Sequence, residues 1–246
     1  MTHSPVLLVV AHGSRDPRHA ATVHALARHV RSLRPGMRVE TAFLDFNVPS
    51  VPRVLGRLAA DGVRDVVALP LLLTRAFHAK ADIPAVLRQA PRVLRIRQAE
   101  VLGPSPLLLA AVERRLYEAG LTPADKSSTG LVLAAAGSTD PEAIAVIAQT
   151  ARELRHTGWC AVRPAFASAS LPRTEDAVRA LRTDGFSRVA VAPYVIAPGR
   201  LPDRITEGAG EADVVASVLG ASPELARLLL CRYDEARAEH LLAAGA

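Results

Sequence analysis

Three side chains that can bind metal ions or carry protons follow apolar runs in the first half of the chain. His12 ends V-V-A-H, Asp45 ends A-F-L-D and His78 ends T-R-A-F-H, with a separation of 33 positions each time. Two imidazoles and a carboxylate suit a divalent transition metal such as iron, cobalt, nickel or zinc. The same groups suit general acid–base catalysis, because histidine titrates near neutral pH. The residues by themselves leave both chemistries open.

The second half of the chain repeats the first half but lacks these three side chains. The segment A-H-G-S-R-D-P at 11–17 corresponds to A-A-G-S-T-D-P at 135–141. The replaced pairs are, in chain order, His12 and Ala136, Asp45 and Ser168, and His78 and Leu201. Because the repeat keeps the surrounding motifs, the fold does not need the three polar side chains, and we expect them to carry the function.

Short β-rich apolar runs alternate with helical stretches along both halves, which predicts parallel sheets covered by helices. In the first half the expected strands are 6–11, 38–44, 65–72 and 93–102, and the expected helices are 17–33, 50–60, 79–90 and 106–119. In the second half they are strands 130–136, 160–166, 188–196 and 213–219, with helices 141–156, 173–184, 200–209 and 223–239. Ligands of such sheets bind beyond the carboxyl ends of the strands. His12, Asp45 and His78 all belong at that edge.

The repeat predicts two similar doubly wound α/β lobes, each built on a four-stranded parallel sheet. We expect an N-terminal lobe at 1–121 that carries the active site. A polar linker at 122–129 leads to a degenerate duplicate lobe at 130–246.

The G-S-x-D-P segment is present in both copies and is typical of the turn into a helix. Gly13 permits a tight turn, Ser14 or Asp16 can cap the helix, and Pro17 suits its first turn. The amides at the helix start are, alternatively, a place for an anion. We expect Trp159 and the phenylalanines to be core residues. Five further histidines are expected to be solvated on polar helix faces: His19, His24, His29, His156 and His240.

The composition disfavours a nucleic-acid interface and a membrane span. The net charge is +6, but the basic residues are dispersed and aromatic residues make up only 4% of the chain. This charge favours a small anionic ligand. No apolar run reaches the roughly 18 residues of a membrane span. Cys160 and Cys231 lack metal-type spacing, and Met1–Pro5 leads directly into a strand, so we expect a cytoplasmic protein without a signal peptide.

Three motifs resemble the class II tetrapyrrole chelatases, specifically the sirohydrochlorin ferrochelatases and cobaltochelatases. They are A-H-G-S-R-D-P, A-F-L-D-x-x-x-P-S-V and L-P-L-L-L-T-R-A-F-H-A-K-A-D-I-P. The resemblance covers nearly the whole chain, since the long bacterial members are likewise fused duplicates with one active half. It implies two four-stranded lobes that face a cleft holding the macrocycle.

The resemblance also implies roles for individual residues. Fe²⁺ or Co²⁺ would be held by His12 and His78, which would also accept the pyrrole protons. Asp45 stands where the family often has a glutamate, and T-R-A-F-H departs from the common glycine-containing form of that loop. The substrate carboxylates would be bound by Ser14, Arg15, Arg75 and Lys80. No organic cofactor is implied, and a fused duplicate is expected to act as a monomer.

We therefore expect a sirohydrochlorin chelatase, with iron favoured, giving sirohaem. Cobalt insertion for cobalamin synthesis is the alternative, and nickel also fits the donor set. A metal or tetrapyrrole carrier would use the same ligands without turnover. A phosphohistidine-type phosphatase is disfavoured because Ala11 stands where that chemistry needs an arginine. Nucleotide-binding lobes are disfavoured because neither copy has a G-x-G-x-x-G turn.

Overall fold

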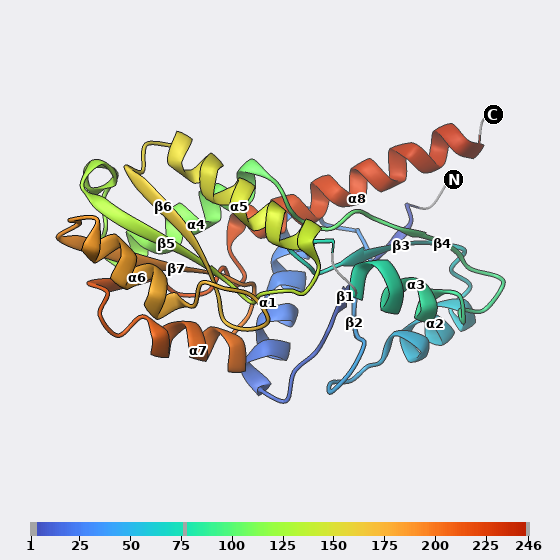
Figure 1. Ribbon diagram of the computed structural model, residues 1–246. Coiled ribbons are helices and arrows are strands. Elements are labelled where there is room, and N and C mark those ends of the chain that lie inside the picture. Colours follow the sequence, from blue (N-terminus) through green and yellow to red (C-terminus); the bar gives the residue numbers. More distant parts are fainter. Residues whose placement is uncertain (1–3, 76–77, 245–246) are drawn as a thin grey trace. The chain divides into compact units, whose positions relative to one another are not determined.

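The computed structural model describes residues 4–75 and 78–244 and contains two all-parallel four-stranded sheets (Figure 1). The first sheet has the order β2-β1-β3-β4, and the second has the order β6-β5-β7-β8. The strands of the first sheet are β1 (Val6–Ala11), β2 (Val39–Phe43), β3 (Asp65–Pro70) and β4 (Arg95–Gln98). Those of the second are β5 (Thr129–Ala135), β6 (Ala161–Phe166), β7 (Arg188–Tyr194) and β8 (Val214–Val215). The predicted α/β fold with two similar sheets is confirmed.

The central strand of each sheet is an uninterrupted apolar run because helices cover both of its faces. All six residues of β1 are buried, and so are all seven of β5. Strand β1 pairs in parallel with β2 and β3, so that Ala11 lies opposite Phe43 and Val10 lies opposite Pro70. Parallel pairing places the carboxyl ends of these three strands at one edge of the sheet, where the loops begin that carry the candidate residues.

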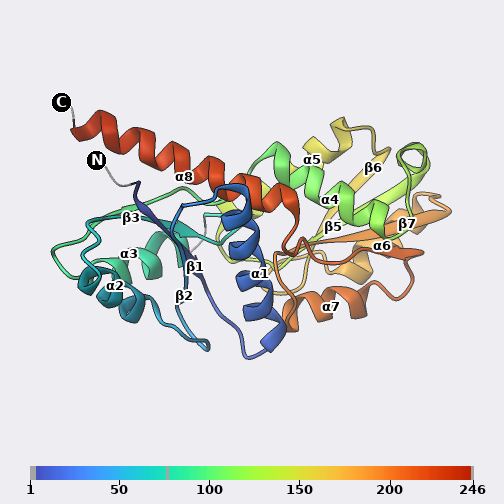
Figure 2. The ribbon, with the colours of Figure 1, turned by 180° about the vertical axis from the view of Figure 1, so that it is seen from behind.

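The sheet of the N-terminal unit lies between two pairs of helices (Figures 1 and 2). On one face lie α1 (Pro17–Leu33) and α8 (Pro223–Ala244), which pack against each other. On the other face lie α2 (Val51–Ala60) and α3 (Ile83–Leu87), which enclose a core formed with alternate residues of β1, including Leu8 and Val10.

The C-terminal unit repeats this arrangement. Helices α4 (Pro106–Glu118) and α5 (Pro141–His156) pack together on one side of the sheet. Helices α6 (Thr174–Thr183) and α7 (Arg200–Gly208) enclose the core on the other side, with Val132 and Ala134 of β5.

The structure divides into two compact units whose boundaries differ from the lobe boundaries expected from the sequence, 121 and 130. One unit comprises residues 1–103 together with 221–246, and the other comprises 104–220. Helix α4 follows β4 in the sequence but packs beside β7, and the last helix, α8, packs beside β3. The two copies have therefore exchanged their final helices. Sequence similarity cannot reveal such an exchange, because both helices present equivalent residues.

Equivalent arginines fix the exchanged helices. Arg232 of α8 donates to the carbonyl oxygens of Val101 and Leu102 at 2.9 and 3.1 Å. Arg115, its counterpart in α4, donates twice to the carbonyl oxygen of Leu219, at 3.1 and 2.8 Å. Leu102 and Leu219 occupy the same place in the V-L-G-x-S-P repeat. Each loop is therefore closed by an arginine from the other copy's helix.

Several elements differ in detail from the sequence expectation. The predicted linker contains a 3₁₀ helix, Pro123–Ser127, in which the carboxylate of Asp125 accepts from the amide of Thr122 at 2.7 Å. The helix expected at 79–90 is a π-helical turn, His78–Asp82, that continues into the short α3. Within the described residues, no helix has the length and apolar character needed to span a membrane.

Candidate metal and substrate site

The first two loops at the carboxyl edge of the N-terminal sheet are joined by main-chain hydrogen bonds. His12 directly follows β1, and Asp45 lies two residues after β2. The amide of Leu44 donates to the carbonyl oxygen of Ala11 at 3.0 Å, and the amide of Asp45 donates to that of His12 at 2.9 Å. These bonds extend the strand pairing into the loops. They bring the main chains of the predicted residues His12 and Asp45 next to each other.

Gly13 allows the two loops to approach each other this closely. Its φ is +98°, and a Cβ placed on it would lie only 1.9 Å from the carbonyl oxygen of Asp45. The duplicate unit makes the same crossing, because a Cβ on Gly137 would lie 1.8 Å from the carbonyl oxygen of Ser168. Both copies therefore build the same backbone. They differ in the side chains that the backbone presents.

Ser14 has a structural role that its duplicate repeats. Its amide donates to Oδ1 of Asn47 at 2.8 Å, and its hydroxyl oxygen accepts from the amide of Asp16 at 3.1 Å. Ser138 makes the same hydroxyl contact with Asp140 at 3.0 Å. Asp16 then caps α1 by accepting from the amide of Arg18 at 2.9 Å. The turn explanation of G-S-x-D-P accounts for these contacts.

His12 is partly buried and has a defined orientation. Its Nδ1 lies 3.2 Å from the carbonyl oxygen of Gly13, and its ring centroid lies 6.1 Å from that of Phe46. A carbonyl oxygen only accepts hydrogen bonds, so this contact requires a proton on Nδ1 when the imidazole is neutral. The lone pair then lies on Nε2. That nitrogen is the one that can bind a metal ion or accept a proton.

Asp45 is exposed, and its carboxylate accepts from the amide of Phe46 at 2.8 Å. One oxygen is thus occupied by the loop itself, and the side chain is held close to the backbone. Phe46 was expected in the core, as all phenylalanines were, but its side chain is 51% exposed. That expectation is wrong for Phe46, because a residue at the tip of this turn projects away from the sheet.

His19 and His24 are half-buried and contact other side chains, so the expectation that they are solvated on a polar helix face is wrong for both. His19 packs against Phe43 with ring centroids 6.4 Å apart, and its Nδ1 is buried without a hydrogen-bond partner in the described part of the chain. Burial lowers the pKa of His19, and the charge of His12 lowers it further. His24 contacts the hydroxyl of Thr41 at 3.1 Å. Helical spacing could have predicted the position of His19, because it lies four residues before Val23 and thus on the buried face of α1.

His78 is the first residue of the π-helical turn after β3, and its side chain lies outside the part that the structure describes. The next residue, Ala79, is buried, and its carbonyl oxygen accepts from Nε2 of Gln98 at 3.2 Å. The turn is thereby attached to the end of β4. Among the described side chains no group of three or more His, Cys, Asp or Glu forms a metal site. The metal-ligand roles of His12 and His78 therefore stay predictions.

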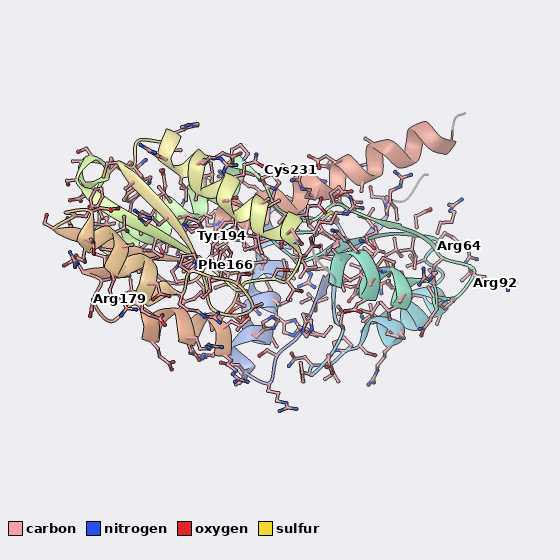
Figure 3. The ribbon with its side chains drawn as sticks, viewed as in Figure 1. Arg64, Arg92, Phe166, Arg179, Tyr194 and Cys231 are labelled. Atoms are coloured by element: carbon pink, nitrogen blue, oxygen red, sulfur yellow. The ribbon has the colours of Figure 1, made fainter. Side chains whose placement is uncertain are left out.

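The predicted basic contacts are spread along this edge. Arg15 is exposed, with its guanidinium carbon 5.4 Å from the ring centroid of Phe46. Arg75 is exposed and lies 3.7 Å from a carboxylate oxygen of Glu100, and Lys80 is exposed on the π-helical turn. Other arginines lie at the amino ends of the strands: Figure 3 shows Arg64 before β3 and Arg92 before β4. Arg15, Arg75 and Lys80 thus lie at the edge that carries the candidate residues, whereas Arg64 and Arg92 lie at the opposite end of the sheet.

The C-terminal unit has a cavity of about 520 Å³ between α6 and α7. Figure 3 labels two of the residues that line it, Phe166 and Arg179. Its charged lining residues are Arg173, Arg179, Arg204, Glu175, Glu207 and Glu211. None of them corresponds to His12, Asp45 or His78. The cavity is therefore not a second copy of the candidate site.

The fold and the site together define a duplicated parallel α/β protein that keeps a histidine and a carboxylate at the strand ends of one copy. A family model described as CbiX matches residues 6–119 and 130–236, which are the two copies. The chain belongs to the CbiX family. This match confirms the resemblance stated from the motifs, and with it the prediction of an enzyme of the metal chelatase class.

Similar proteins extend over nearly the full chain. A sirohydrochlorin cobaltochelatase from Priestia megaterium is 28% identical, and the match covers 93% of this chain and 79% of that protein. A sirohydrochlorin ferrochelatase from the same organism is 26% identical, covering 91% and 87%. The structure of SirB from Bacillus subtilis with Fe³⁺ has a TM-score of 0.81 at 23% identity, covering 95% of this chain and 96% of that one. This last likeness shows that the fold is shared.

Proposed function

We propose that the protein inserts a divalent metal ion, Fe²⁺ or Co²⁺, into sirohydrochlorin. The observation that carries the proposal is the difference between two matched backbones. The same glycine crossing and the same loop hydrogen bonds present His12 and Asp45 in one copy, and Ala136 and Ser168 in the other. The relatives described as cobaltochelatase and ferrochelatase support this substrate and these two metals.

The reaction exchanges two pyrrole N–H protons for one metal dication, so the site must hold a cation and accept protons. Nε2 of His12 provides the lone pair for either step, with Nδ1 fixed against the carbonyl oxygen of Gly13. We assign His78 as the second metal ligand and proton acceptor. The Asp45 carboxylate lowers the electrostatic cost of holding the cation and of the protonated imidazole.

The substrate is a polycarboxylate, and we assign its anionic groups to the basic side chains at the same edge. Arg15, Arg75 and Lys80 are exposed there. Guanidinium groups bind carboxylates through paired hydrogen bonds. We assign Ser14 a contact through its hydroxyl, which keeps acceptor and donor capacity beside the turn bond to Asp16.

Iron is our first choice of metal, giving sirohaem, and cobalt is the alternative. Nickel fits the same donor types. A carrier that binds metal or tetrapyrrole without turnover is the second candidate function, because it would use the same ligands. Action as a monomer, a cytoplasmic location and the absence of an organic cofactor stay predictions.

The test is anaerobic insertion of Fe²⁺, Co²⁺ and Ni²⁺ into sirohydrochlorin, followed by visible absorbance. The wild type is compared with His12→Ala and with His156→Ala, which changes an exposed histidine of the C-terminal unit. We expect acceleration by the wild type and by His156→Ala, and a loss of about 100-fold or more in His12→Ala. Binding of sirohydrochlorin without acceleration over the enzyme-free rate would identify a carrier. Full activity in His12→Ala would remove His12 from the mechanism.

A further inference from the structure

Phe46 has a backbone conformation and an exposure that are unusual for an aromatic residue. Its φ is +61°, in the left-handed region, and half of its side chain faces solvent. This region is disfavoured for L-residues other than glycine, because it brings Cβ too close to the following carbonyl oxygen. The hydrogen bond from its amide to the carboxylate of Asp45, at 2.8 Å, holds the residue in place. The loop therefore fixes an aromatic ring where it gains little from burial.

The second copy shows that the turn does not need the ring. Ala169 occupies the equivalent position with a φ of +58°. The residue that follows makes the same main-chain contact in both copies: the amide of Asn47 donates to the carbonyl oxygen of Asp45 at 2.7 Å, and the amide of Ser170 donates to that of Ser168 at 2.6 Å. Alanine is thus sufficient for this backbone. Phe46 joins His12, Asp45 and His78 as a side chain that only the first copy carries.

The neighbours of Phe46 indicate what its ring can contact. The ring of His12 lies with its centroid 6.1 Å from that of Phe46, and the two planes are inclined by 36°. The Arg15 guanidinium carbon lies 5.4 Å from the Phe46 ring centroid. The half-exposed ring of Phe46 therefore lies near both a candidate metal ligand and a cation. A flat conjugated ligand with peripheral carboxylates would use all three groups at once.

We propose that Phe46 is a positioning residue that stacks on the tetrapyrrole, placing the macrocycle beside Nε2 of His12 while Arg15 binds a carboxylate. This inference rests on the proposed function. Aromatic stacking strengthens binding beyond the burial of apolar area alone. Together these two contributions lead us to expect an affinity change of about 10-fold when the ring is removed. The metal is bound by other side chains, so its affinity should not change.

The experiment compares Phe46→Ala, which installs the side chain of the duplicate, with Phe46→Trp, which keeps an aromatic face. Val48→Ala is the matched control, because Val48 lies on the same loop and is 77% exposed. Binding of metal-free sirohydrochlorin is measured by absorbance titration, and KM and kcat are measured separately for tetrapyrrole and for Co²⁺. We expect Phe46→Ala to raise Kd and KM for the tetrapyrrole about 10-fold. The KM for Co²⁺ and the Tm should stay unchanged, and Phe46→Trp should restore tetrapyrrole binding.

Two other results would overturn the inference, and the first of them separates it from the proposed function. In the first result, the wild type inserts metal and Phe46→Ala binds sirohydrochlorin as tightly as the wild type. This result would support the chelatase function and refute the stacking role of Phe46. A wild type that binds no sirohydrochlorin overturns both. If the wild type binds the tetrapyrrole without turnover, insertion fails as the function. The Kd ratio between wild type and Phe46→Ala then still decides the stacking role.

Discussion

The carbonyl oxygen of Asp45 lies where a side chain on Gly13 would begin, 1.9 Å from an ideal Cβ. This contact joins the loops after β1 and β2, so that the main chains of His12 and Asp45 lie next to each other, linked by the hydrogen bond from the Asp45 amide to the His12 carbonyl oxygen. The corresponding contact between Gly137 and Ser168, at 1.8 Å, joins loops that have alanine and serine in place of His12 and Asp45. The close approach of the two loops is thus a property of the fold in both copies. The imidazole and the carboxylate are present in only one copy, so the fold does not depend on them.

Gly13→Ala is expected to destabilise the protein by at least about 2 kcal/mol, because the left-handed φ strains alanine and the loops must separate. Gly137→Ala should cost a similar amount, since its geometry is the same. Urea denaturation gives both values. The two variants should differ in metal insertion: folded Gly137→Ala should retain the rate, and Gly13→Ala should lose it. A Gly13→Ala protein as stable as the wild type would contradict the close approach of the two loops.

Asp45→Ser, which installs the residue of the second copy, should slow metal insertion by about 100-fold with no change in Tm. The backbone tolerates serine at this place, as Ser168 shows, so the loss reflects the missing charge. Asp45→Glu should retain most of the activity, because it keeps the carboxylate. Initial rates with Co²⁺ and Fe²⁺ test both variants. Equal rates in Asp45→Ser and wild type would show that the carboxylate takes no part.

Helix α8 is expected to be essential for the N-terminal unit, although it lies at the other end of the chain. A chain ending at residue 121 lacks the helix that packs on α1 and β3, so we expect it to unfold or aggregate. Residues 1–103 joined to 221–246 by a flexible linker should instead unfold cooperatively, as near-UV circular dichroism would show. Cooperative unfolding of the 1–121 chain would refute the helix exchange.

The same exchange makes Arg232 a specific stabilising residue. Arg232→Ala removes the donors to the Val101 and Leu102 carbonyl oxygens and should lower the free energy of unfolding by about 1–3 kcal/mol. Arg115→Ala should have a similar effect through Leu219. Arg227→Ala, on the solvent side of α8, is the control and should be neutral. Chemical denaturation of the three variants distinguishes these outcomes.

His19 should make the stability of the metal-free protein depend on pH. Burial, and then the charge of His12, lower its pKa in the folded state, against a smaller opposite effect of Asp16. The unfolded chain, with a pKa near about 6.5, therefore binds more protons between the two pKa values. The contribution of His19 to the free energy of unfolding is therefore complete above the unfolded-state pKa. It falls as the pH drops below that value toward the lower pKa of the folded state.

Replacing His19 isolates this effect from the other titrating groups. Urea denaturation between pH 8 and pH 5, values spanning the ordinary histidine pKa of about 6.5, should show a shallower acid loss in His19→Gln than in the wild type. The control is His156→Gln, which changes an exposed histidine and should follow the wild-type curve. Parallel curves for His19→Gln and wild type would show that His19 does not titrate differently on folding.

The sequence by itself determined the class of fold and the residues that distinguish one copy from the other. The alternation of apolar runs with helices predicted the parallel sheets, and the internal repeat singled out His12, Asp45 and His78 by comparison with Ala136, Ser168 and Leu201. This worked because the periodicity of buried strands and the presence or absence of a side chain are both local properties of the chain. The turn role of Ser14 and Asp16 was predictable for the same reason.

Only the tertiary structure decided which helix covers which sheet, how close the two loops approach and which side chains are buried. The sequences around Arg115 in α4 and Arg232 in α8 are equivalent. Nothing local in the sequence therefore shows which of the two sheets each helix packs on. His19 is polar, yet the packing of α1 beside β2 places it against Phe43. Phe46 is apolar, yet the turn directs it to solvent. Burial depends on contacts between segments distant in sequence, and those contacts exist only once the chain has folded.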